Sequence, residues 1–131
     1  MKLRIRGNSL RLRLGQSEVA QLVKDGCVSA SIRFSGFPKD QLAYSVVTSQ
    51  AEKEITARLA DSKIKVTVPE GLAQGWANSP QVALKHVQPI DSEVSLSILI
   101  EKDFRSLEPR PDEDQSDSFQ NPSEGKHCNH P

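Results

Sequence analysis

Hydrophobic and polar residues alternate in short runs along the first hundred positions, a pattern that predicts β-strands. In the opening run the apolar positions change from odd numbers (3 and 5) to even numbers (10, 12 and 14). A single flat strand would turn these two sets to opposite faces, whereas a hairpin that turns at Gly7-Asn8 returns them to one face. The predicted hairpin pairs Ile5 with Leu10, and a β-bulge at Gly7 is the alternative.

The same alternation predicts six further strands, at positions 28–34, 42–46, 55–59, 64–68, 82–86 and 94–101. Two short helices are expected between them. Ser17 is suited to cap the first helix, and Gly26 is placed to end it. Pro69 suits the first turn of the second helix, in which Leu72 and Trp76 lie one turn apart.

The predicted elements follow one order twice: hairpin, helix, hairpin. Apolar positions 5, 10, 12 and 14 recur 54 residues later at positions 59, 64, 66 and 68. Duplication is one explanation, and two amphipathic β segments that align by period alone are the other. We therefore expect an α+β domain, mainly antiparallel β, in which two pseudo-repeats form an eight-stranded closed or nearly closed small barrel.

Composition narrows the possible protein classes. The chain has 131 residues with 17 basic and 17 acidic side chains, which suits one small domain and argues against nucleic acid as a partner. No apolar run approaches the roughly 20 residues that span a bilayer, and the N-terminus lacks the continuous apolar stretch of a signal peptide. We therefore expect a cytoplasmic protein with no membrane partner.

The alternating pattern ends at Asp103-Phe104. Residues 1–104 are therefore predicted to form a single β-rich domain, and residues 105–131 an acidic, largely disordered tail, because the tail has few large apolar residues. The tail contains the acidic run at positions 112–114. Leu107 and Phe119 are able to anchor it on the domain, and a free solvated tail is the alternative.

The opening hairpin carries the clearest candidate for function. Its register places Arg4 opposite Arg11 and Lys2 opposite Arg13, so the outer face becomes a ladder of cations. Like charges directly opposite each other are destabilising, so carboxylates, water or a bound anion should offset the repulsion. The sequence therefore predicts a binding or accessory module that engages an anionic ligand or an acidic protein segment through Lys2, Arg4, Arg11 and Arg13.

The end of the chain supplies the alternative function, a metal- or thiol-dependent role. His127, Cys128 and His130 are soft and borderline ligands that lie close together. Structural zinc needs four ligands, and the other Cys or His residues, Cys27 and His86, fall in the body of the domain. The cluster is therefore an incomplete zinc motif, and we otherwise expect no cofactor and no disulfide.

Catalytic templates are absent from the sequence. It has no Gly-x-Ser-x-Gly elbow, phosphate loop, Gly-x-Gly-x-x-Gly turn or Cys-x-x-Cys pair. Glu101 and Asp103 read as generic acids at a strand end, and Trp76 as a core anchor rather than a ligand platform. We therefore do not expect an enzyme.

The opening MKLRIRGNSLRLRL, the Ser17-Glu18-Val19 that follows, and EKDF at positions 101–104 resemble a family of small bacterial proteins of uncharacterised function. The resemblance covers nearly the whole chain, supports a single domain and implies no particular activity. Relatives carry a cysteine two positions after the phenylalanine, where this chain has Ser106, and an Asn-Pro before a terminal cysteine, matching Asn121-Pro122 and Cys128. If the paired cysteines are ligands or a redox pair, this chain has lost one of them.

Overall fold

The structure, a computed structural model, describes residues 1–104 and 116–120 and contains two four-stranded sheets and two helices. Sheet A has the order β1-β2-β8-β7, formed by Lys2–Ile5, Ser9–Leu14, Ser95–Lys102 and Ala83–Pro89. Sheet B has the order β3-β4-β6-β5, formed by Cys27–Arg33, Gln41–Ser49, Lys63–Pro69 and Thr56–Ala60. Helix α1 covers Gln16–Asp25, and α2 covers Glu70–Ala77. The predicted eight strands and two helices are therefore confirmed.

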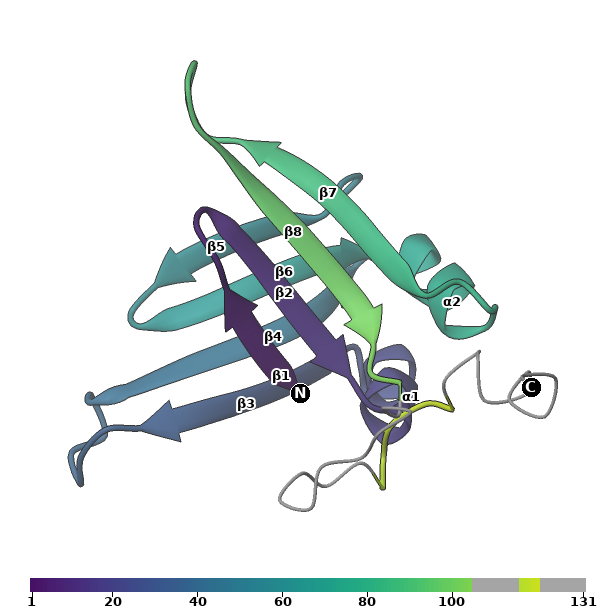
Figure 1. Cartoon of the computed structure of the whole chain (residues 1–131), viewed down its shortest axis with the longest axis horizontal. Helices are drawn as coiled ribbons and strands as arrows, with labels where there is room; N and C mark the ends of the chain where they lie inside the picture. Colours follow the sequence, from purple (N-terminus) through teal and green to yellow (C-terminus); the bar gives the residue numbers. More distant parts are fainter. Residues whose placement is uncertain (105–115, 121–131) are drawn as a thin grey trace, which may run out of the picture.

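The two sheets form two layers whose strands cross obliquely, with both helices at one end (Figure 1). The core lies between the layers and is continuous, since buried apolar side chains from both sheets and both helices belong to one cluster. The order hairpin, helix, hairpin occurs twice, and each half of the chain contributes one hairpin to each sheet. Descent of the halves from a duplicated sequence stays a prediction.

The turns of two of the predicted hairpins follow from their residue types. Gly7 has a φ of 55°, and backbone hydrogen bonds between Arg6 and Ser9 close a two-residue turn. Asp61 and Ser62 both have positive φ, 51° and 60°, which is typical of the mirror-image turns that match strand twist. The first register is the predicted one, so the bulge alternative at Gly7 is wrong.

Strand pairing inside the sheets is mixed. Four of the six pairings are antiparallel, and the two central ones, β2 with β8 and β4 with β6, are parallel. Each parallel pair joins one half of the chain to the other. The prediction of a mainly antiparallel protein therefore holds at the level of the hairpins, while the middle of each sheet differs from it.

The predicted closed or nearly closed barrel is wrong, because neither sheet closes and the layers diverge away from the helices. Burial decreases along inward-facing positions in that direction: Val28 is buried but Ile32 in the same strand is 50% exposed, and Ala57 is buried but Leu59 is 72% exposed. The helices fill the space between the sheets at one end only. Within the described residues no strand of sheet A pairs with a strand of sheet B, so the sheet edges do not complete a barrel.

A side chain links the sheets at one pair of edges. The Gln88 amide of β7 accepts a hydrogen bond from the Ala57 backbone N–H (2.7 Å) and donates one to the Ala57 carbonyl (3.0 Å) in β5. In the registers of the two sheets, Ile32 of β3 takes the place that Gln88 has in β7. Because an isoleucine has no hydrogen-bonding group, the corresponding position at the opposite edge offers no such link.

Helix α1 starts two residues earlier than predicted and is capped differently. Gly15, not Ser17, is the N-cap residue, and its N–H donates to the Glu18 carboxylate at 2.9 Å. The Asp117 carboxylate accepts hydrogen bonds from the Ser17 N–H (3.1 Å) and hydroxyl (2.8 Å). A Cβ on Gly15 would lie 2.2 Å from that carboxylate, so only glycine permits this approach.

Residues 116–120 therefore lie against the domain. Besides the Asp117 cap, the ring of Phe119 packs on Phe104 with 5.6 Å between centroids. The Lys102 ammonium lies 5.6 Å from the Phe119 ring and 5.8 Å from the Trp76 ring, and it donates to the Ser79 carbonyl at 2.6 Å. Burial lowers the pKa of Lys102. The domain boundary at residue 104 and the largely disordered tail stay predictions, since most of positions 105–131 lie outside the described residues.

Candidate anion-binding face

The outward side of sheet A carries a concentration of positive charge, here called the basic face and formed by Lys2, Arg4, Arg6, Arg11, Arg13 and Lys85. Alternation along β2 produces it, because the leucines at positions 10, 12 and 14 are buried and the arginines between them point outward. Pairing with β1 then places Arg4 opposite Arg11 and Lys2 opposite Arg13, as predicted. Anion binding by these four residues remains a hypothesis at this point.

Carboxylates neutralise part of the basic face. Glu101 Oε1 accepts hydrogen bonds at 2.6 Å from the Nε of both Arg11 and Arg13. Lys2 Nζ lies 3.1 Å from Asp103 Oδ2. Both acids come from β8 and the residue after it, and the parallel pairing of β2 with β8 places them there. These acids, which read as generic in the sequence, are thus the neighbouring carboxylates that one explanation of the ladder requires.

The bridging carboxylate is buried, and its electrostatics follow from its partners. Burial alone would raise the pKa of Glu101, but hydrogen bonds and charge attraction from Arg11 and Arg13 outweigh it and lower the pKa below its ordinary value. The group is therefore ionised at neutral pH. A carboxylate whose pKa is lowered by folding stabilises the protein above its unfolded pKa, and this contribution is lost as the pH falls through the folded pKa.

Glu101→Gln should accordingly lower the free energy of unfolding at pH 7 by about 1–2 kcal/mol, because the two guanidinium groups lose their charged acceptor. The difference between wild type and variant should shrink below about pH 4.3, where the unfolded-state glutamate becomes protonated. Urea denaturation at pH 7 and at pH 3.5 measures both quantities. A difference that is the same at the two pH values would contradict this account of Glu101.

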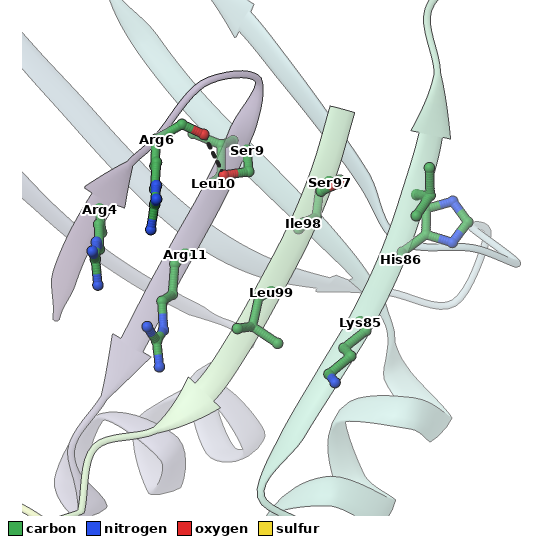
Figure 2. A pocket seen from close by; sticks show the side chains of 11 residues that line it. Arg4, Arg6, Ser9, Leu10, Arg11, Lys85, His86, Ser97, Ile98 and Leu99 are labelled. Carbon is green, nitrogen blue, oxygen red and sulfur yellow. Dashed lines mark hydrogen bonds between the residues drawn. The ribbon is translucent and has the colours of Figure 1, made fainter. Parts of the chain in front are cut away.

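Three cations of the basic face have no ion-pair partner among the described residues: Arg4, Arg6 and Lys85. They line an open pocket of about 390 Å³ on the outer surface of sheet A (Figure 2). Its remaining lining consists of Ser9, Leu10, Arg11, His86, Val87, Ser97, Ile98 and Leu99. The structure thus separates the predicted set into Lys2, Arg11 and Arg13, which have acidic partners, and Arg4, which faces the pocket without one.

Arg6 and Lys85 were missed as candidates in the sequence. Arg6 could have been predicted, because it continues the outward alternation from Arg4 and begins a local turn that ends at Ser9. Lys85 reaches the site only because β8 lies between β2 and β7, which puts Arg11, Leu99 and Lys85 in one cross-strand row. Figure 2 shows Leu99 between the other two. No local pattern in the sequence reports that order of strands.

Two other residues singled out in the sequence, Trp76 and His86, have surroundings typical of structural side chains. Trp76 is fully buried, and its Nε1–H donates to the Val82 carbonyl at 3.0 Å, so it is a core anchor. His86 Nε2 lies 3.9 Å from an oxygen of the exposed Glu54, at the edge of the core. This distance makes the pair a loose one, without the geometry of a hydrogen-bonded general base.

The candidate metal ligands are not brought together by the described part of the chain. His127, Cys128 and His130 lie outside the described residues, and Cys27 is an exposed free thiol at the start of β3. Within residues 1–104 and 116–120, no group of three His, Cys, Asp or Glu side chains is placed to hold a metal ion.

Comparison with protein families matches residues 1–123 to a family described as "Family of unknown function (DUF7009)". No curated protein and no solved structure matches the chain. The family match agrees with the resemblance to an uncharacterised family, while bacterial origin and cytoplasmic location stay predictions. Neither helix of the described chain is long and apolar enough to cross a membrane.

Proposed function

We propose that this chain, which belongs to the family of unknown function, is a small binding module whose basic face holds an anionic ligand. One observation carries the proposal: Arg4, Arg6 and Lys85 line a single pocket, and none of them has an ion-pair partner among the described residues. Guanidinium groups bind phosphate and carboxylate oxygens in a planar, bidentate manner. An anion in the pocket would therefore meet prepared donors.

The energetics of the hairpin support the same function. Arg4 lies directly opposite Arg11, a cross-strand arrangement of like charges that destabilises a hairpin. Glu101 offsets the charge of Arg11 but forms no hydrogen bond or ion pair with Arg4 among the described residues. Side chains that lower stability without local compensation are typical of functional sites, where a ligand supplies the missing interaction. A bound anion would supply it here.

The zero net charge of the chain limits the kind of partner. The electrostatic attraction for anions comes from one pocket and not from the whole protein, so the pocket suits a compact anion better than a long polyanion. The metal- or thiol-dependent alternative rests on His127, Cys128 and His130. Because those residues lie outside the described part of the chain, no contact in the structure favours it over anion binding.

Arg4→Glu combined with Arg6→Glu should abolish pyrophosphate binding, since both substitutions place a carboxylate in the pocket. Stability should be unchanged or slightly higher, because the carboxylate introduced at position 4 would face Arg11, and opposite charges across a hairpin contribute about 0.2–1 kcal/mol. NMR titration with pyrophosphate in low salt measures binding, and thermal unfolding measures stability. The two readouts separate loss of the site from loss of the fold.

Sheet B offers a matched control. Arg58 lies opposite Lys65 in its outer hairpin, as Arg4 lies opposite Arg11 in sheet A, and both are exposed. Arg58→Glu combined with Lys65→Glu makes the same change in net charge away from the pocket, so pyrophosphate should bind as it does to wild type. Equal binding by wild type and the Arg4/Arg6 variant, or undetectable binding by wild type in low salt, would refute the proposed function.

A further inference from the structure

We infer that the ligand of the basic face is an organic anion with a flat apolar body, in which the anionic group meets the arginines and the body lies over Leu99 and Val87. This inference rests on the proposed function and specifies its ligand class. Among the residues that line the pocket, Leu99 stands between Arg11 and Lys85, and Val87 is 60% exposed at the next outward position of β7. The pocket therefore has cations on both sides and an apolar floor.

The dimensions of the row favour a ligand larger than an inorganic ion. Arg4, Arg11, Leu99 and Lys85 occupy successive strands, and neighbouring strands lie about 4.8 Å apart. The β1–β2 arginines are thus about 10–14 Å from Lys85 at the backbone. Phosphate alone would contact the arginines and leave the leucine in water, whereas an attached ring system would cover the leucine and approach the lysine.

Sheet B contains a corresponding row of four residues that has the cations but no apolar floor. Its register aligns Arg58, Lys65, Ser45 and Ser29 across β5, β6, β4 and β3. The pair of cations is present in both rows, but two serines occupy the places of Leu99 and Lys85. The cations therefore do not require an apolar neighbour for folding, and the leucine is a feature of the pocket in sheet A.

Removing apolar area from water is favourable, so the exposed part of Leu99 would add to the affinity of a ligand that covers it. Leu99 is half-buried, and its neighbours toward β2 and β7 are both charged. A purely ionic site would gain from a polar residue at this position, as in sheet B. Cations around an apolar floor match a ligand that carries its charge at the end of an apolar body, because each part of such a ligand finds its complement.

Three probes test the inference by NMR titration of the full chain: inorganic phosphate, 1-naphthyl phosphate and uncharged 1-naphthol. The wild type should bind 1-naphthyl phosphate about tenfold more tightly than phosphate, from apolar area removed from water, and should bind naphthol weakly. Leu99→Ser, which copies the row of sheet B, should weaken the binding of 1-naphthyl phosphate and so bring the two phosphates close to equal affinity. Val87→Ser should also reduce the preference for 1-naphthyl phosphate. This second variant keeps the inference testable if Leu99→Ser does not fold.

The other outcomes distinguish failure of the inferred ligand class from failure of the proposed anion-binding function. Equal affinity for both phosphates in the wild type, with binding still lost in the Arg4→Glu/Arg6→Glu variant, would overturn the apolar body and leave the anion site standing. Naphthol binding as tight as that of 1-naphthyl phosphate would overturn the anionic group. Binding of none of the probes, nor of pyrophosphate, would overturn both the ligand class and the proposed function.

Discussion

Trp76→Ala should lower the free energy of unfolding by about 3–5 kcal/mol, the range for removing a large aromatic side chain from a packed core. Trp76 is fully buried in α2 at the end where both helices and both sheets meet. The substitution removes apolar burial, leaves a cavity and takes away the hydrogen bond from Nε1 to the Val82 carbonyl. Since a domain is stable by about 5–15 kcal/mol, the variant should be near the limit of folding. Urea denaturation followed by circular dichroism measures the change.

Leu72→Ala is the control in the same helix. Leu72 and Trp76 lie one turn apart, as predicted from the sequence, but Leu72 is 46% exposed, and Ala73 is the other buried residue of the helix. The control should cost less than about 1 kcal/mol, because little apolar area is lost from the core. Similar losses for Leu72→Ala and Trp76→Ala would mean that the helix packs through a different face.

Gln88→Leu should lower the free energy of unfolding by about 1–3 kcal/mol, because it leaves the backbone N–H and carbonyl of Ala57 without their side-chain partner. Leucine keeps the approximate volume, so the effect reports the hydrogen bonds more than packing. Gln88→Glu should be intermediate in cost at neutral pH, since its carboxylate is able to accept from the N–H but repels the carbonyl. Urea denaturation of the three proteins gives the comparison.

Gln81→Leu is the matched control for the link between the sheets. Its amide donates to the Ala83 carbonyl in an exposed position, so its loss should change stability by no more than about 0.5 kcal/mol. If the Gln81 and Gln88 variants lose the same amount, the Gln88 amide does not tie β7 to β5. Hydrogen exchange of the Ala57 amide is an independent check, because that N–H should exchange faster in Gln88→Leu.

The sequence by itself determined the strands, the helices and the registers of the two hairpins that have two-residue turns. Alternation assigns each residue to one of two faces, and a two-residue turn then fixes which residues are opposite each other. Arg4 opposite Arg11 and Leu59 opposite Ile64 follow from contacts within a few residues of a turn. These features are local, so a single sequence contains all the information that they need.

Only the tertiary structure decided which strands lie side by side and which side chains share the basic face. Alternation shows that an apolar face must be buried but not against which partner, because the hydrophobic effect is non-directional. The parallel pairing of β2 with β8 brought Glu101 to Arg13 across 88 positions and put Leu99 and Lys85 beside the arginines. Likewise, Asp117 caps α1 from 100 positions away, which a cap prediction based on Ser17 could not include. The expected barrel failed for the same physical reason: strand number and period do not report whether the edges of two sheets approach closely enough to share backbone hydrogen bonds.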